Sequence, residues 1–215
     1  MVNTIVYLGI EMIYKNQKAF TLAEVLITLL IVGVIASIVI PGLIQDSQQA
    51  EYKAAWKKSF ADISNASKLL SQEYGGNLTG VCSTHVCIRD LYLKYLSYNS
   101  LCNGSTVVGN CWNIDGAKGL NGGTVLTPAW FGGAALTVNN GQFYYFETSS
   151  GACNPACYVF VVDVNGFKGP NTAGKDIYYA LIHNNGIAKP YGSGSTPSCP
   201  SGNGLDCSNK YLYSN

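Results

Sequence analysis

The chain has 215 residues, of which only 12% are charged, and its 13 basic and 12 acidic side chains nearly cancel. A neutral chain lacks the basic surface of a nucleic-acid-binding protein, so nucleic acid is not an expected partner. The length suits one membrane segment followed by one globular domain. Eight cysteines indicate an oxidising compartment for that domain.

Residues 1–19 are expected to be a leader that is removed from the mature chain. Lys15 and Lys18 lie next to the apolar run that follows, and basic residues in that place favour a cytoplasmic N-terminus. This orientation would carry the rest of the chain across the membrane. Met12 offers a second start, which would shorten the leader to the eight residues MIYKNQKA.

Residues 20–44 are a run of 25 almost entirely apolar residues, FTLAEVLITLLIVGVIASIVIPGLI. As a helix, residues 20–40 would rise roughly 31 Å, which matches the ~30 Å hydrocarbon core of a bilayer. The one charged residue in the run is Glu24. A carboxylate inside a membrane costs on the order of 2.5–3.5 kcal/mol, so Glu24 requires a partner. The run holds no basic residue. The candidates are therefore a lipid head group, another chain, or an amino terminus created by cleavage beside Phe20.

Residues 18–24 (KAFTLAE), followed by the apolar run, resemble the N-terminus of type IV prepilins and type II secretion pseudopilins. The resemblance implies that prepilin peptidase cleaves between Ala19 and Phe20 and that the new Phe20 amine is methylated. It further implies that Glu24 pairs with a subunit N-terminus during filament assembly. Ala19 stands where the family usually has Gly, and Ala23 stands where it more often has a larger aliphatic residue.

The resemblance implies a structural subunit. It would enter the bacterial inner membrane with its head in the periplasm, and then polymerise with itself or with other pilins into a periplasmic or cell-surface filament. Pro41 lies 21 residues after Phe20, at a position where the family commonly has proline, and a bend or local melting of the helix is expected there. An enzyme is not expected, because the sequence has no nucleophile elbow, zinc-binding helix or phosphate-binding glycine loop.

Two other interpretations of the N-terminal segment remain open. Val34-Ile35-Ala36 before Ser37 fits conventional signal cleavage, and the run could also stay as an uncleaved anchor. The alternative function is then a monomeric, membrane-anchored or secreted adhesion module with a Gly- and Tyr-rich surface.

Residues 45–74 are expected to continue the helix as an amphipathic segment. Its apolar residues recur every three or four positions, which predicts one stripe along a helix. The stripe consists of Tyr52, Trp56, Phe60, Ile63, Ala66, Leu70 and Tyr74. Gly75-Gly76 then supply a stop signal. The rest of the chain is expected to cover the stripe.

Residues 75–215 form the expected globular head. Asn139-Asn140-Gly141 and Asn184-Asn185-Gly186 are turn signals between β-rich runs, and such short connections favour an antiparallel meander. A short helix is expected near residues 88–98. The predicted fold is α+β and pilin-like, with a long N-terminal helix packed on a small antiparallel sheet with Gly- and Cys-rich loops. The expected strands are 134–138, 142–148, 158–164, 177–183 and 187–189.

The cysteines fall into four successive pairs, and disulfides within these pairs are the simplest prediction. A zinc site is the weaker alternative, because two cysteines around His85 lack a usual finger spacing and no second pair completes them. The pairs are Cys82/Cys87, Cys102/Cys111, Cys153/Cys157 and Cys199/Cys207.

Residues 163–176 alternate oxygen-bearing side chains with glycines, a layout that can wrap a hard cation. The stretch resembles the D-x-N-G…P-N…G-x-D loop of many prepilin-type proteins, and some pseudopilins bind calcium in a comparable loop. Candidate ligands for Ca²⁺ are Asp163, Asn165, Asn171 and Asp176. The alternative is a turn that Asx and Gly residues stabilise and that holds two strands in register. The expected structural role requires no cofactor.

Overall fold

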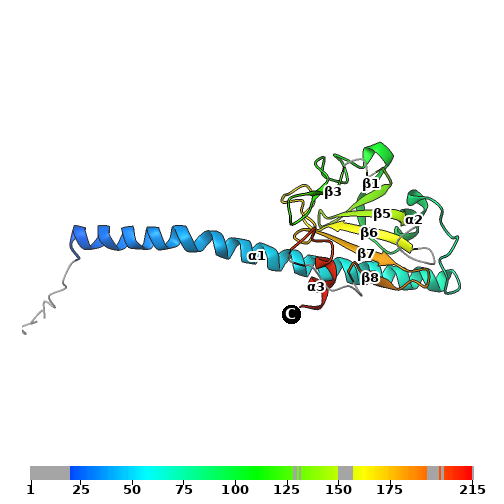
Figure 1. The fold of residues 1–215 in the computed structure, drawn as a ribbon, viewed down its shortest axis with the longest axis horizontal. Helices are drawn as coiled ribbons and strands as arrows, with labels where there is room; N and C mark the ends of the chain where they lie inside the picture. Colours follow the sequence, from blue (N-terminus) through cyan, green and yellow to red (C-terminus); the bar gives the residue numbers. More distant parts are fainter. Residues whose placement is uncertain are drawn as a thin grey trace, which may run out of the picture. The chain divides into compact units, whose positions relative to one another are not determined.

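The computed structural model describes residues 20–127, 130, 132–149, 157–192, 199 and 201–214, with the backbone alone for Ser149 and Cys157. The chain divides into two compact units, the first ending at Gln45 and the second spanning Asp46–Asn215. Helix α1, Leu22–Glu73, begins in the first unit and continues into the second (Figure 1).

Helix α1 contains Pro41 as an interior residue. A proline removes one backbone donor, but its φ is compatible with a helix. The helix therefore continues through this position, and the local melting expected there as one alternative is not present in this structure.

The stripe predicted on residues 45–74 is the buried face of α1 in the second unit. Trp56, Ile63 and Leu70 have no exposed surface, whereas Tyr74 at the end of the stripe is 39% exposed. Small polar residues share the buried face. The hydroxyl of Ser67, for example, donates to the carbonyl of Ile63 at 2.7 Å. The sequence pattern thus identified the side of the helix on which the head is built.

Helix α1 ends at the two glycines that were predicted to stop it. The N–H of Gly76 donates to Ser71 O at 2.7 Å, and the N–H of Gly75 donates to Gln72 O at 3.3 Å. Both glycines have positive φ values, 70° and 90°. This pair of bonds is a Schellman motif, which satisfies carbonyls that the end of a helix leaves without partners.

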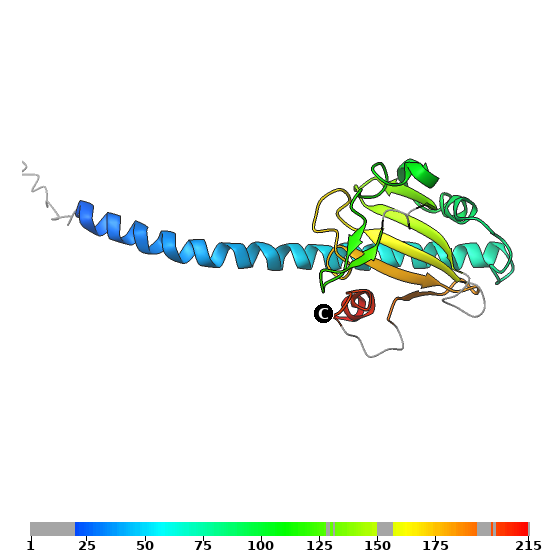
Figure 2. The ribbon, with the colours of Figure 1, turned by 45° about the horizontal axis from the view of Figure 1, so that its top comes forward.

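The head contains a six-stranded antiparallel sheet in the order β1-β4-β5-β6-β7-β8. Figure 2 shows its strands lying side by side. The strands are β1 Tyr98–Asn103, β4 Ala134–Val138, β5 Phe143–Ser149, β6 Cys157–Asp163, β7 Ile177–Ile182 and β8 Ala188–Pro190.

The meander predicted from the turn signals is confirmed for β4 to β8. Gly141, with φ 83°, follows β4, and its N–H donates to Val138 O at 2.8 Å. Gly186, with φ 77°, does the same after β7, where its N–H donates to His183 O at 2.9 Å. Glycine accepts a positive φ at both turns without steric cost.

The helix predicted near residues 88–98 is misplaced. Helix α2 spans His85–Tyr92 and begins earlier because the hydroxyl of Thr84 caps it, accepting a bond from the N–H of Cys87 at 3.2 Å. Tyr98 instead opens β1, which pairs with β4.

The two faces of the sheet form two separate cores. Along β5, Tyr144 and Phe146 lie in the core shared with α1 and α2, and Phe143 and Tyr145 lie in the opposite core. This alternation follows from the two-residue period of a strand. The second core is closed by the segment containing the 3-10 turn Gly104–Thr106 and strands β2 Ala117–Lys118 and β3 Thr124–Leu126.

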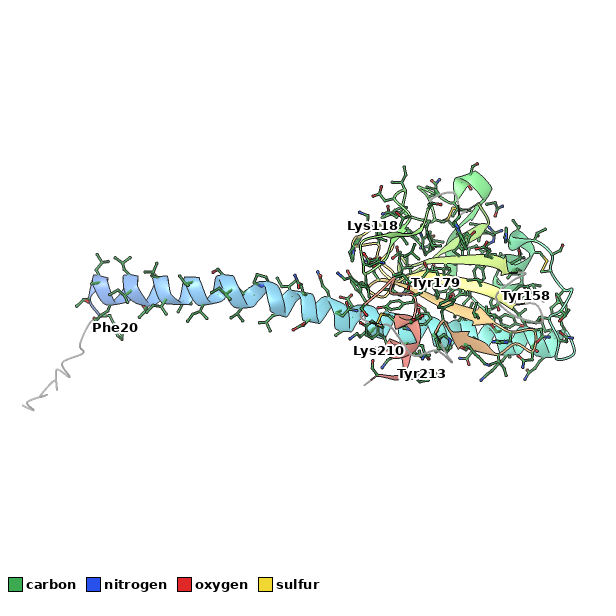
Figure 3. All side chains as sticks on the ribbon, in the orientation of Figure 1. Phe20, Lys118, Tyr158, Tyr179, Lys210 and Tyr213 are labelled. Carbon is green, nitrogen blue, oxygen red and sulfur yellow. A yellow bond between two sulfur atoms is a disulfide. The ribbon has the colours of Figure 1, made fainter. Side chains whose placement is uncertain are left out.

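The C-terminal helix α3, Cys207–Tyr213, joins α1 to the edge of the sheet. The indole N–H of Trp56 donates to Ser208 O at 2.9 Å, and the N–H of Tyr179 on β7 donates to the Ser208 hydroxyl at 2.9 Å. Trp56 also stacks on Tyr178, with ring centroids 5.2 Å apart. Figure 3 labels Tyr179 and, near the end of α3, Tyr213.

Replacing Trp56 by Ala is expected to lower the free energy of unfolding by about 3–5 kcal/mol, because it empties a fully buried site and removes the bond to Ser208. The measurement is denaturant unfolding of the full chain in detergent. Leu69→Ala on the same helix is the control. That side chain is 45% exposed, and its loss should change the free energy by no more than about 0.5 kcal/mol. Equal losses in the two variants would contradict this packing.

Candidate functional site

The first unit, described from Phe20, has an apolar surface on all sides of its helix. Its large apolar side chains are between 43% and 83% exposed. Figure 3 shows them standing outward along this part of α1, with Phe20 labelled at the start. Among the described residues, α1 is the one helix whose length and apolar composition would let it cross a membrane. A surface of this kind requires lipid or other protein around it.

Glu24 is bound to the start of α1 by a reciprocal cap with Thr21. The backbone N–H and the hydroxyl of Thr21 donate to Glu24 Oε2 at 2.8 and 2.9 Å. In return, Thr21 Oγ1 accepts a bond from the N–H of Glu24 at 3.2 Å. This arrangement is a capping box, which satisfies orphan donors of the first helical turn. The carboxylate therefore lies within one turn of Phe20, the residue that follows the expected cleavage position.

Both bonds from Thr21 end on the same carboxylate oxygen of Glu24. Within the described part of the chain, the second oxygen, Oε1, is thus open to a further donor. Among the described residues, no basic side chain forms an ion pair with Glu24. The geometry leaves room for an amine at Glu24.

Residues 14–40 match the family model described as the prokaryotic N-terminal methylation motif. This motif is the signature of type IV prepilins and pseudopilins, and the match covers the expected cleavage position, Glu24 and most of the apolar run. The chain therefore carries the N-terminal signature of such precursors over residues 14–40, and its α+β head has a pilin-like arrangement of helix and sheet. No curated protein and no solved structure matches the chain.

Three disulfides lie in the described part of the head, and each joins cysteines that are successive in the sequence. They are Cys82–Cys87, Cys102–Cys111 and Cys199–Cys207. The first follows α1, the second joins β1 to the segment that closes the second core, and the third fastens α3. Cys153, half of the fourth expected pair, lies outside the described residues.

The candidate calcium loop connects β6 to β7 and brings its four candidate ligands together in two linked pairs. Asp163 Oδ1 accepts bonds from the N–H groups of Asn165 and Gly166, at 3.1 and 2.9 Å. The two oxygens of Asp176 accept bonds from the N–H groups of Thr172 and Asn171, at 2.7 and 2.8 Å. Each carboxylate therefore shapes its own end of the loop, as an Asx-stabilised turn requires.

Both carboxylates of this loop are fully buried. Burial, and after it the nearby charge of Asp176, raise the pKa of Asp163 well above its usual range, against the pull of two backbone N–H groups. Burial also raises the pKa of Asp176. Neither carboxylate forms an ion pair with a described Lys, Arg or His side chain. Two buried carboxylates without a counter-charge are an unfavourable arrangement.

Three further oxygens of the loop take no part in the hydrogen bonds of the turn. Asp163 Oδ2, Asn165 Oδ1 and Asn171 Oδ1 are buried and have no hydrogen-bond partner among the described residues. A turn explains the bonded oxygens but not these three. In the described ranges, no group of three or more His, Cys, Asp or Glu side chains could hold a metal ion, so a cation here would depend on two carboxylates and on amide oxygens. Calcium prefers such ligands, whereas zinc prefers sulfur and imidazole.

Two residues of these sites were not identified from the sequence. Thr21 stands three positions before Glu24, and this T-x-x-E spacing is a recognisable capping-box signal. Tyr52 accepts a hydrogen bond from the side-chain amide of Asn165 at 3.1 Å. No sequence pattern connects positions 113 residues apart.

Replacing Thr21 by Ala is expected to loosen the first turn of α1, because it removes the hydroxyl that caps Glu24. Loss of an N-cap costs about 1 kcal/mol, so amide hydrogen exchange at Glu24 should accelerate roughly fivefold. Exchange is measured by NMR on the chain in micelles. Thr21→Ser keeps a hydroxyl and should exchange as the wild type does.

Thr28→Ala is the matched control, since the Thr28 hydroxyl donates to the carbonyl of Val25 and takes no part in the cap. If Thr21→Ala and Thr28→Ala give the same exchange rate at Glu24, the capping role is wrong.

Proposed function

We propose that the protein is a structural subunit, a pilin or pseudopilin, of a type IV pilus-like or type II secretion filament. Prepilin peptidase cleaves it before Phe20, and the new amine is methylated. The chain rests in the inner membrane with its head in the periplasm until assembly. The N-terminal part of α1 then leaves the lipid and packs with the same segment of other subunits.

The observation that carries this proposal is the position of Glu24. It is the one charged side chain of the apolar run 20–44 and lies in the first turn after the expected cleavage position. Thr21 engages one oxygen of its carboxylate, which is not enough to neutralise a charge inside a membrane. An amine produced by cleavage before Phe20 supplies the missing positive charge. A neighbour's Phe20 amine does so as well, and this pairing would give register to the filament.

The apolar surface of the segment supports packing between helices in the same way. Lipid and apolar side chains are equally hydrophobic, so association of such helices depends on close van der Waals packing. Gly33 and Gly42 interrupt the large side chains, and a Cβ at either position would meet no atom of this chain within 4 Å. These two glycines leave places at which another helix backbone could approach.

The construction of the head is consistent with a subunit that faces an oxidising compartment. Three disulfides fasten its loops and its C-terminal helix. Such bonds form and persist outside the cytoplasm. The periplasm and the cell surface both meet this requirement.

Replacing Glu24 by Ala or by Gln is expected to block filament incorporation while leaving membrane insertion, cleavage and the head intact. Gln keeps an oxygen that can accept the bond from the Thr21 N–H but carries no charge. The two variants therefore separate charge pairing from helix capping. Incorporation is measured in the sheared surface fraction of cells, and cleavage is measured by mass spectrometry of the N-terminus. Both variants should fall at least tenfold in the sheared fraction.

Asp46→Asn is the matched control, because this exposed carboxylate lies just beyond the apolar segment and should be dispensable. Wild-type incorporation of Glu24→Gln would refute the pairing with an amine. A mature chain that starts at Ser37 would refute cleavage before Phe20. A monomeric adhesion module would tolerate every one of these substitutions.

A further inference from the structure

The second core of the head is not completely filled by the described side chains. A cavity of about 340 Å³ lies over strands β5, β6 and β7 and is bordered by β3. This volume is at the lower end of the range found for small-molecule sites. Its walls are mainly apolar, and four aromatic side chains contribute to them: Trp130, Tyr145, Tyr179 and Tyr191.

The pairing of the strands explains the shape of the cavity floor. Tyr145, Val161 and Tyr179 lie opposite one another on β5, β6 and β7. Neighbouring strands are about 4.8 Å apart, so the two tyrosines start from backbone positions roughly 10 Å apart, with the smaller valine between them. The result is a trough between two aromatic side chains, which a small apolar group can enter.

Contacts with neighbouring residues hold the aromatic side chains around this trough. The hydroxyl of Tyr145 donates to Trp130 O at 2.7 Å, which fixes Trp130 beside the cavity. Tyr179 meets Tyr191 edge to face, with ring centroids 6.4 Å apart and ring planes at 62°. The face of an aromatic ring is electrically negative, and rings set at an angle to one another are the arrangement that surrounds organic cations.

Glu147 supplies a carboxylate at the same cavity. It is partly buried and lies opposite Val159, in the next row of residues across the sheet. Burial raises the pKa of this carboxyl group. No described Lys, Arg or His side chain forms an ion pair with it, and the described residues that line the cavity include no basic one. A cation that brings its own apolar surface would therefore complement this wall.

The hydroxyl of Tyr179 is a second polar group of the cavity that lacks a partner. The side chain is only 6% exposed, and its Oη forms no hydrogen bond with the described residues. Burial raises the pKa of this hydroxyl, so it stays neutral and can accept a hydrogen bond. Since a buried hydroxyl without a partner is unfavourable, a ligand with an N–H group would satisfy it.

We propose that this cavity binds a small free organic cation, an ammonium ion carried on an aryl or short alkyl group. The apolar group fills the trough between Tyr145 and Tyr179. The ammonium group lies against the aromatic rings, pairs with Glu147 and donates a hydrogen bond to Tyr179 Oη. The proposal concerns the head alone and does not depend on filament assembly, so the two can fail separately.

The test is a titration of the full chain with phenethylammonium chloride in a maltoside detergent, which contains no amine. Calorimetry should show one equivalent bound. Tryptophan emission should change as well, because Trp130 lines the cavity and is 57% exposed, whereas Trp56 and Trp112 are fully buried. The neutral analogue 2-phenylethanol has nearly the same shape and should bind about tenfold more weakly, since it lacks the charge.

Glu147→Gln is the decisive variant, because it removes the charge and keeps the size of the side chain. Its affinity for phenethylammonium should fall about tenfold, while its affinity for 2-phenylethanol should not change. Tyr179→Phe keeps the ring and removes the hydroxyl, so the affinity for phenethylammonium should fall about threefold. Glu51→Gln, an exposed carboxylate on α1, is the matched control and should bind as the wild type does.

Four outcomes would contradict the proposal. Absence of phenethylammonium binding at millimolar concentration would overturn the site itself. Equal affinity for 2-phenylethanol, or an unchanged affinity in Glu147→Gln, would overturn its selectivity for a cation. Displacement of phenethylammonium by phosphatidylethanolamine at the same amine concentration would overturn its assignment to a free ligand. A lower unfolding temperature of ligand-free Tyr179→Phe would show that the hydroxyl has a partner in the protein and would overturn its role in binding.

Discussion

The two parts of helix α1 require cover for their apolar surfaces in different ways, and the rest of the structure depends on this difference. Up to Gln45 the surface of α1 is apolar on all sides and exposed, so its cover has to come from lipid or from other protein. Beyond Asp46 only one side is apolar, and the sheet, α2 and α3 cover it. A subunit that, as we propose, is anchored first and assembled later would require this division, because the first surface would change its surroundings while the second would not.

Both units place very few carboxylates in apolar surroundings. The apolar segment keeps a single carboxylate, and the residue that caps it, Thr21, lies directly after the expected first residue of the mature chain. The head keeps two buried carboxylates in one loop and surrounds them with backbone N–H donors and amide oxygens. In each place the described residues leave part of the charge unbalanced.

Much of this arrangement follows from local patterns, whereas the remainder depends on contacts that no local pattern records. The stripe around Trp56, the glycines after α1 and the Asn-Asn-Gly turns were sufficient to predict the long helix and the meander. Strand β1, Tyr98–Asn103, was missed because this edge strand exposes both of its faces and lacks apolar alternation. Residue types alone predicted the oxygen-rich loop. That its oxygens are buried, and that Tyr52 holds Asn165, results from the tertiary packing of distant segments.

The bond between Trp56 and Ser208 spans 152 positions of the sequence, from near the start of the head to seven residues before the end of the chain. The core around Trp56 therefore depends on α3, which supplies the acceptor for the indole N–H. A head without α3 would leave the indole of Trp56 without its hydrogen-bond acceptor and its core incomplete.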